Sequence, residues 1–286
     1  AVNSDLLRGY AREVYGNPSA PRPTTSIYRV LKSLEIKDRL ERYTCNKIES
    51  SFYWYPETEF CYLTNDNGLF LAAKGGDNNE SHNHNDVGSC IFYIDQEPIL
   101  IDVGVETYTR QTFSEDRYEI WTMQSNYHNL PMINGIPERE GQEYASKTVV
   151  ARPELFSLDI SGAYPEEAQV HKWTRTYSIS SIGLQIRDFF KLKKIIAPNT
   201  INFITWGAVE DNGKGNVLIS IKDVRAQLSY DTTLFNLKIE PIPLSESSLH
   251  SVWGDNVYRL SFTAKDLVYK GEYNFIVIKT NNSNVE

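Results

Sequence analysis

One stretch of the sequence, residues 88–103, indicates the fold most clearly. It begins with Gly88-Ser89 and continues as Cys90-Ile91-Phe92-Tyr93-Ile94, then Asp95-Gln96-Glu97-Pro98, then Ile99-Leu100-Ile101-Asp102-Val103. Two short apolar runs joined by a few polar turn residues are typical of a β-hairpin. This stretch therefore predicts antiparallel β-structure in the body of the chain.

Similar segments lie on both sides of this hairpin. From about Ser51 the pattern has a period of two, as in Ser51–Tyr55 and Leu69–Leu71. After Gln142, further strand-like segments follow near residues 147–152, 155–160, 170–180, 183–193, 200–206, 216–222, 226–230, 236–241, 257–263 and 272–279. Many short strands at regular spacing predict a mainly β protein built as an antiparallel β-sandwich.

The first 45 residues have a helical pattern instead. Apolar residues recur at helical spacing between Leu6 and Tyr15 and again between Ile27 and Leu34, with a Pro-rich connector over residues 18–23. Two helices bury little apolar surface by themselves. The sequence starts without Met and without a charged segment followed by an apolar one, so we expect no signal peptide and interpret the chain as a fragment.

Composition excludes several classes of protein. The 286 residues include 41% hydrophobic and 12% aromatic residues, which is too apolar for a disordered chain. The formal net charge of −8 is opposite to the basic footprint of nucleic-acid-binding proteins, so no nucleic-acid partner is expected. A local cluster of Lys and Arg can still bind a polyanion, because screening isolates it from distant charges. No apolar run approaches the roughly 20 residues of a membrane span.

Three of the five histidines gather in two short stretches. The first is Ser81-His82-Asn83-His84-Asn85-Asp86-Val87-Gly88, and the second is Tyr127-His128-Asn129-Leu130-Pro131. If the first stretch is extended, His82, His84 and Asp86 point to one face and can hold a cation such as zinc. The competing interpretation is a polar strand end whose side chains are hydrogen-bonded.

Two other families contain a His-x-His pair. Metallo-β-lactamase-type hydrolases use His-x-His-x-Asp-His, but Val87 replaces the last His here and an alternating βα pattern is absent. Cupins combine His-x-His with a carboxylate and a distant His in an all-β fold. A cupin-like metalloenzyme, with His82 and His84 both on the metal, therefore remains a possible alternative.

A longer pattern of residues favours a different family. It combines the first histidine stretch with Pro98-Ile99-Leu100-Ile101-Asp102-Val103-Gly104, Tyr108-Thr109-Arg110 and His128-Asn129-Leu130-Pro131-Met132-Ile133-Asn134-Gly135. This pattern resembles the heparinase II/III family of polysaccharide lyases. Similar residues follow at Ala163-Tyr164-Pro165 and Trp173-Thr174-Arg175, so the resemblance covers essentially the whole chain.

The resemblance implies a two-part enzyme, an N-terminal (α/α) toroid followed by an antiparallel β-sandwich of the super-sandwich type, with the active-site cleft between them. This chain looks like the second part. Residues 1–45 are then a helical stub or linker from the end of a toroid that the chain lacks. Residues 46–286 are then the β-sandwich domain.

The resemblance also implies roles for individual residues. His82 matches a catalytic His, and His84, Asp102 and His128 match a structural zinc site. Asp86 remains the competing carboxylate ligand.

Five further residues near these positions are candidates. Tyr108 and Arg110 follow Asp102 closely, which makes Tyr108 a second catalytic candidate and Arg110 a substrate-binding one, with Tyr118 and Arg117 as rivals. Asn129 is a candidate for orienting substrate or a ligand, or for satisfying the following turn.

The implied reaction is β-elimination at a uronic acid. A base removes the C5 proton, α to the C6 carboxylate, while an acid protonates the leaving oxygen at C4. Because the toroid supplies part of this machinery, we expect the chain alone to be weakly active or inactive. The resemblance implies a periplasmic or secreted location and a substrate such as a heparin-type glycosaminoglycan, alginate or another uronate polymer.

Two points stay open at the level of sequence. The chain can instead be a non-catalytic carbohydrate-binding or interaction β-sandwich with a structural metal. Basic residues form a second group of candidates for sugar carboxylates or sulfates, although alternation favours a solvated sheet face for the last three: Arg152, Lys172, Arg175, Lys191, Lys193 and Lys194.

Overall fold

The computed structural model describes Tyr28 and residues 50–280 of the chain. The chain separates into two compact units, Ala1–Glu49 and Ser50–Glu286. The predicted helical segment and its boundary at residue 45 lie outside the described residues, apart from Tyr28.

A five-stranded antiparallel sheet contains the hairpin from which the fold was predicted. Its strands, in spatial order, are β1 (Ser51–Tyr55), β2 (Phe60–Thr64), β3 (Leu69–Lys74), β5 (Cys90–Ile94) and β6 (Glu97–Leu100). The predicted β5–β6 hairpin is confirmed, but its turn has two residues rather than four. Asp95 and Gln96 both have positive φ, the conformation of a tight turn whose twist matches that of the flanking strands.

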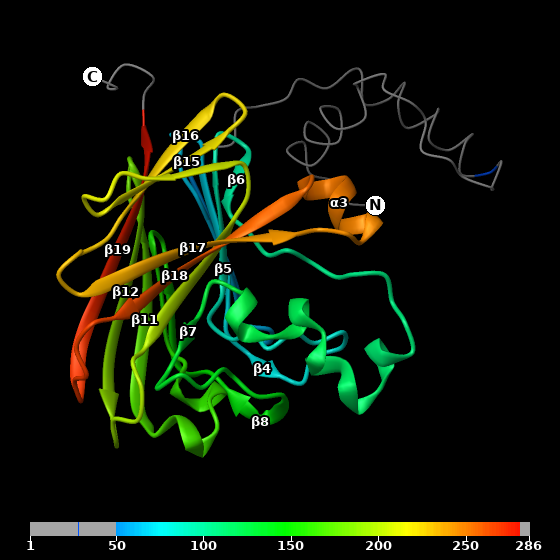
Figure 1. Ribbon diagram of the computed structural model, residues 1–286, viewed down its shortest axis with the longest axis vertical. Helices are drawn as coiled ribbons and strands as arrows, with labels where there is room; N and C mark the ends of the chain where they lie inside the picture. The colour runs from blue at the N-terminus through cyan, green and yellow to red at the C-terminus, as the bar shows by residue number, and fades with distance from the viewer. Residues whose placement is uncertain (1–27, 29–49, 281–286) are drawn as a thin grey trace. The chain divides into compact units, whose positions relative to one another are not determined.

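Three further sheets complete the domain. An eight-stranded sheet has the order β14 (Ala208–Asp211), β15 (Asn216–Ile221), β16 (Val224–Ser229), β19 (Lys270–Thr280), β12 (Gly183–Leu192), β11 (Val170–Ile179), β10 (Leu155–Asp159) and β9 (Lys147–Arg152). A four-stranded sheet has the order β17 (Phe235–Pro243), β18 (Asn256–Ala264), β13 (Thr200–Thr205) and β7 (Pro131–Met132). The last sheet pairs β4 (Asp77–Asn78) with β8 (Gly141–Ala145). Every segment predicted as a strand after Gln142 forms one, and the long strands β11, β12 and β19 lie side by side (Figure 1).

The eight-stranded sheet packs against both other large sheets. Trp54 of β1 contacts Phe156 of β10, with 5.8 Å between ring centroids. Phe203 of β13 contacts Phe275 of β19 at 5.1 Å. Alternating side chains of the sheets thus enclose a largely continuous apolar core. The predicted antiparallel β-sandwich is confirmed.

Short helical segments lie outside the sheets. Four 3₁₀ turns follow one another between the first sheet and β7: η1 (Gln111–Phe113), η2 (Glu115–Glu119), η3 (Trp121–Met123) and η4 (Ser125–Tyr127). Two more, η5 (Ser161–Ala163) and η6 (Glu166–Ala168), connect β10 to β11, and α3 (Ser247–Trp253) connects β17 to β18. Within the described residues, no helix is long and apolar enough to span a membrane.

A buried polar network joins the sheets. Arg175 of β11 and Asp188 of β12 have fully buried side chains and form an ion pair of 2.7 Å, and Asp188 also accepts from the Trp173 indole. Arg175 donates to the backbone oxygen of Asn129. Arg175 was a candidate for sugar binding, but complete burial prevents it from contacting a substrate.

Glu138 is a second buried ionisable side chain that joins separate segments of the chain. Its Oε2 accepts from Asn78 Nδ2 of β4 and from the Val87 backbone N–H. Burial raises the pKa of Glu138 to about 8, even though these two hydrogen bonds favour the charged form. Its other oxygen, Oε1, has no hydrogen-bond partner.

Breaking the Arg175–Asp188 pair should destabilise the domain strongly. We expect Asp188→Asn to lower the free energy of unfolding by about 3–5 kcal/mol, because it leaves a buried guanidinium without a countercharge. The matched control is Glu97→Gln, which removes the partner of the exposed Lys222 and should cost less than about 1 kcal/mol. Urea unfolding measures the free energy of unfolding of both variants. A loss in Asp188→Asn as small as that in Glu97→Gln would contradict the stabilising role of the buried ion pair.

Glu138 should make the stability fall as pH rises. In the folded state its carboxyl has a pKa of about 8, whereas in the unfolded state the ordinary value is 4.5. The folded state therefore binds the proton more tightly. The folded state therefore loses stability between about pH 4.5 and pH 8, by on the order of 5 kcal/mol for a shift of this size. Glu138→Gln should remove that decline, whereas the exposed control Glu140→Gln should retain it. The free energy of unfolding of both variants, measured across this pH range, tests the prediction.

Candidate active site and metal centre

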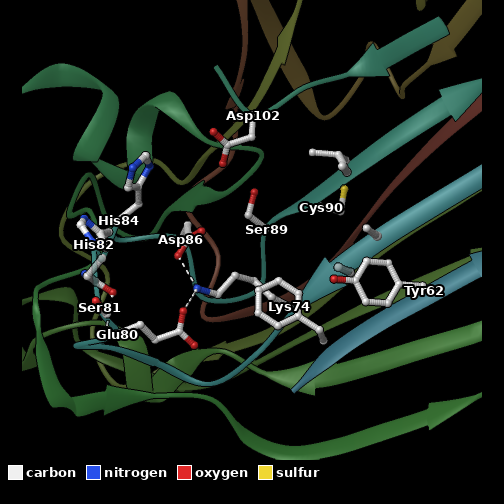
Figure 2. A pocket seen from close by; sticks show the side chains of 15 residues that line it. Tyr62, Lys74, Glu80, Ser81, His82, His84, Asp86, Ser89, Cys90 and Asp102 are labelled. Carbon is white, nitrogen blue, oxygen red and sulfur yellow. Dashed lines mark hydrogen bonds and ion pairs between the residues drawn. The ribbon is translucent and has the colours of Figure 1, made fainter. Parts of the chain in front are cut away.

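An open pocket lies where β3 ends and β5 begins, beside the loop of residues 79–89. Its volume is about 370 Å³. Figure 2 shows that the side chains around it come from this loop, from the first sheet and from the segment after β6. The lining side chains suited to acid–base chemistry or to binding a cation are those of Tyr62, Lys74, Glu80, His82, His84, Asp86 and Asp102. Three of the seven predicted site residues therefore line one pocket.

The loop that carries His82 and His84 is not extended. Residues 81–89 form turns and irregular structure, and His82 has a φ of +63°, in the left-handed region that non-glycine residues seldom adopt. The prediction that His82, His84 and Asp86 share one face of a strand is wrong. The guanidinium of Arg117 is the physical reason, because it donates from Nε and Nη2 to the Asn83 backbone oxygen and holds the chain in this path.

The far end of the loop is held by close packing. Gly88 has a φ of +85°, and a Cβ at this position would lie 2.5 Å from Ile160 Cγ2. The Tyr177 hydroxyl donates to the Gly88 backbone oxygen. Only glycine fits this position, so the loop returns to β5 along a fixed path.

Asp86 forms an ion pair with a lysine. Lys74 at the end of β3 donates to Asp86 at 2.8 Å and to Glu80 at 3.0 Å (Figure 2). Burial opposes the charge on Lys74, but the two carboxylates outweigh it and raise its pKa. This cluster was not predicted from the sequence, where only the position of a lone Lys at the end of an apolar strand could have signalled it.

His84, Asp102 and His128 come together although 44 residues separate the first from the last. One potential ligand atom from each lies within 4.8 Å of the others. Asp102 lies two residues after the end of β6, and His128 directly follows η4. The rings of His84 and His128 are 5.3 Å apart. Within the described residues this is the group with metal-ligand spacing, and neither His82 nor Asp86 belongs to it.

The donor atoms of this group fit a divalent cation. Asp102 Oδ2 lies 3.2 Å from His128 Nδ1, but the contact lacks hydrogen-bond geometry, and both ring nitrogens of His128 are buried without a hydrogen-bond partner. Buried polar atoms are normally paired, so two such nitrogens in one residue require an explanation. A metal ligand role supplies one, since zinc binds imidazole nitrogen and carboxylate oxygen.

The electrostatics of His84 and Asp102 suit a cation, whereas His128 behaves differently: burial opposes its charge, but the Asp102 carboxylate outweighs burial and raises the His128 pKa, so a metal competes with a proton there. Burial, reinforced by the neighbouring His128, lowers the pKa of His84 and favours its neutral form. Burial opposes ionisation of Asp102, but the imidazoles of His128 and His84 outweigh it and hold the Asp102 pKa well below its usual range. The Asp102 side chain keeps 35% of its surface exposed, so solvent screens part of this attraction.

His82 and Tyr108 form a separate pair. The Tyr108 hydroxyl lies 3.2 Å from His82 Nδ1, and the two rings are stacked with 5.7 Å between centroids. The Tyr108 ring also packs edge-on against the exposed Phe113. Both members of the pair remain accessible, with Tyr108 40% exposed. The two predicted catalytic side chains therefore contact each other at the edge of the pocket.

The two predicted substrate-binding residues differ in placement. Arg110 is exposed, and among residues 50–280 its side chain makes no ion pair or hydrogen bond. Asn129 is completely buried, and its amide donates to Cys90 O and Ile101 O and accepts from Ile204 N. Asn129 is thus not available to substrate in this structure. Of the rivals, Arg117 is buried, and the Tyr118 hydroxyl contacts Asn83.

Comparisons with known proteins give a consistent family. The model of the family described as "Heparinase II/III-like, C-terminal" matches residues 48–179. The heparan sulfate lyase HepC from Pedobacter heparinus has a similar structure, with a TM-score of 0.65 and 13% identity over 99% of this chain and 43% of that one. A crystal structure of heparinase III gives a TM-score of 0.65 and 13% identity over 91% of this chain and 42% of that one.

A more distant structure shares the same architecture. Chondroitin AC lyase from Streptomyces coelicolor A3, in complex with chondroitin sulphate, has a TM-score of 0.54 and 8% identity over 99% of this chain and 40% of that one. No curated protein sequence matches the chain. At such low sequence identities, the structural similarity demonstrates a shared fold. The chain spans less than half the length of these enzymes. The family model matches residues 48–179, so this part of the chain is similar to the heparinase II/III-like C-terminal family, and the fold of the chain is similar to that of the C-terminal parts of these lyases.

Proposed function

We propose that this chain is the C-terminal part of a polysaccharide lyase that cleaves uronic-acid-containing polysaccharides by β-elimination. In this proposal His82 and Tyr108 take part in proton transfer, and His84, Asp102 and His128 hold one structural zinc ion. The observation that carries the proposal is the accessible His82–Tyr108 pair beside the pocket, next to a partly buried group with metal-ligand spacing. A purely structural metal site would leave that pair without a role.

The pair suits general acid–base chemistry. With the proton of His82 on Nε2, its Nδ1 accepts from the Tyr108 hydroxyl, and Nε2 faces a substrate as a donor. The elimination needs one group to remove the C5 proton and another to protonate the leaving oxygen. A hydrogen-bonded imidazole and phenol can share these tasks or pass a proton between them.

The pocket by itself lacks one element of the reaction. Removal of the C5 proton places negative charge on the C6 carboxylate, which requires a positive or hydrogen-bonding environment. Lys74, the lysine in the pocket, is already paired with Asp86 and Glu80. We therefore propose that an N-terminal toroid supplies the missing groups, which agrees with the coverage of 43% or less of the similar enzymes.

The proposed zinc has a structural role. When bound, the ion would supply a fixed positive centre for three ligands from separate parts of the chain. His84 would then hold the loop that carries His82, Asp102 the segment leading to Tyr108, and His128 the end of η4. Each catalytic candidate is thus close in sequence to a ligand, so the ligand set orients the His82–Tyr108 pair.

A cupin-like arrangement is less consistent with these contacts. It requires His82 on the metal, whereas His82 is stacked on Tyr108 and lies outside the His84, Asp102 and His128 group. The non-catalytic binding module predicts the same metal site but no effect of His82 on turnover. We also propose a periplasmic or secreted location, where a polymeric acidic substrate is accessible.

Metal analysis of single variants tests the ligand set. We expect His84→Ala, Asp102→Ala and His128→Ala each to lose the bound zinc, and His82→Ala to keep one equivalent, as should the exposed control His171→Ala. A chelator should lower the melting temperature, because a structural zinc contributes to folding free energy. Loss of metal in His82→Ala with retention in Asp102→Ala would instead favour the cupin-type arrangement.

Turnover of the longer enzyme tests the catalytic pair. In a protein that contains this domain together with its toroid, His82→Ala and Tyr108→Phe should each lower kcat by about 10²–10⁴, the usual contribution of a general acid or base. The exposed Tyr53→Phe is the control and should leave kcat unchanged. The 286-residue chain alone should form little unsaturated uronate, measured by its absorbance. Strong turnover by that chain, or full activity of His82→Ala, would overturn the proposal.

A further inference from the structure

A row of lysines crosses the outer face of the eight-stranded sheet. Lys172 of β11 lies opposite Lys191 of β12, which lies opposite Lys270 of β19. Directly paired residues of antiparallel strands point to the same face, and all three side chains are exposed. Neighbouring strands are about 4.8 Å apart, so the backbone positions of Lys172 and Lys270 are separated by roughly 10 Å, with Lys191 between them. We call Lys172, Lys191 and Lys270 the basic row.

The charges of the basic row are not balanced locally. Like charges directly opposite each other destabilise a sheet, and none of the three lysines forms an ion pair within the part of the chain that the structure describes. Glu272 is exposed two residues along β19 but pairs in register with Phe189 and forms no ion pair. This clustering occurs in a chain of net charge −8. A bound anion would relieve the repulsion.

An aromatic ring and a fourth cation extend the row along β12. Phe189 and Arg187 alternate with buried residues and therefore share the face of Lys191. Phe189 is partly exposed, and Lys270 Nζ lies 5.6 Å from its ring centroid. Arg187 is exposed and four residues from Lys191, which corresponds to roughly 14 Å of strand. The face thus presents cations on both sides of an apolar ring.

This combination matches an acidic polysaccharide. Its repeating carboxylates or sulfates can contact separated cations at once, while the C–H face of a sugar ring packs on an aromatic side chain. The open face of a sheet suits an extended polymer better than a single small anion. Nucleic acids are less suited, because their binding sites combine an overall basic domain with several stacking aromatics.

We propose that the basic row, with Phe189 and Arg187, is a second binding site for acidic polysaccharide, distinct from the candidate active site. The polymer class rests on the function proposed above, whereas the charge pattern does not. The two sites lie on different surfaces, because the inner face of the eight-stranded sheet packs on the sheet that borders the pocket. Such a site would retain a long chain near the enzyme between cleavage events.

Heparin binding by the 286-residue chain tests this site. The triple variant Lys172→Gln, Lys191→Gln, Lys270→Gln should weaken the Kd by about tenfold at low salt, as expected for three exposed charge contacts. It should fold normally, since it removes repulsion, and its melting temperature should not fall. The matched triple variant Lys214→Gln, Lys222→Gln, Lys238→Gln removes the same charge from other strands and turns, and should change the Kd less than twofold.

Several results would overturn the proposal. They are an unchanged Kd in the basic-row variant, equal weakening in both triple variants, or equally tight binding of a single-stranded DNA of matched charge. The pocket is tested separately. His82→Ala should leave heparin binding intact, and the basic-row variant should retain turnover of a short oligosaccharide in the longer enzyme. Binding that survives without any turnover would refute the proposed function and keep this site.

Discussion

Asn129 is hydrogen-bonded to three sheets at once, and the arrangement of the domain depends on it. Its side-chain amide donates to Cys90 of the five-stranded sheet and accepts from Ile204 of the four-stranded sheet. Its backbone oxygen accepts from Arg175, which pairs with Asp188 inside the eight-stranded sheet. Every polar group of this buried side chain is satisfied, so any relative shift of the sheets would leave a buried donor or acceptor unpaired.

The same network determines where the candidate metal centre lies. His128 precedes Asn129 and is buried with it, while Asn129 also donates to the Ile101 oxygen next to Asp102. Two of the three potential ligands are therefore adjacent in sequence to groups in the network. A preformed position for ligands lowers the entropy lost when a metal binds.

The candidate site combines a rigid part with an accessible one. His128 is 1% exposed, whereas Tyr108 is 40% exposed and stacks on the accessible His82. Burial lowers the pKa of His84 and favours its neutral form, and the buried ring nitrogens of His128 have no hydrogen-bond partner among the described residues. Both features suit metal coordination. Exposure leaves His82 and Tyr108 able to meet a polymer too large to enter a closed cavity. In the proposed arrangement, the basic row on the outer face would hold such a polymer without competing for the pocket.

Alternating apolar residues, as in Cys90–Ile94, were enough to predict the strands and the sandwich, because a period of two is a local property of the chain. The same was true of the candidates His82, His84 and His128, whose spacing is visible in the sequence. The resemblance also pointed to Asp102 as the partner of His84 and His128, with Asp86 as its rival. Tertiary structure alone decided between these two carboxylates, turned His82 to Tyr108, buried Asn129 and Arg175, and aligned three lysines. These outcomes depend on strand register and on contacts such as Arg117 with Asn83, which connect residues far apart in the chain.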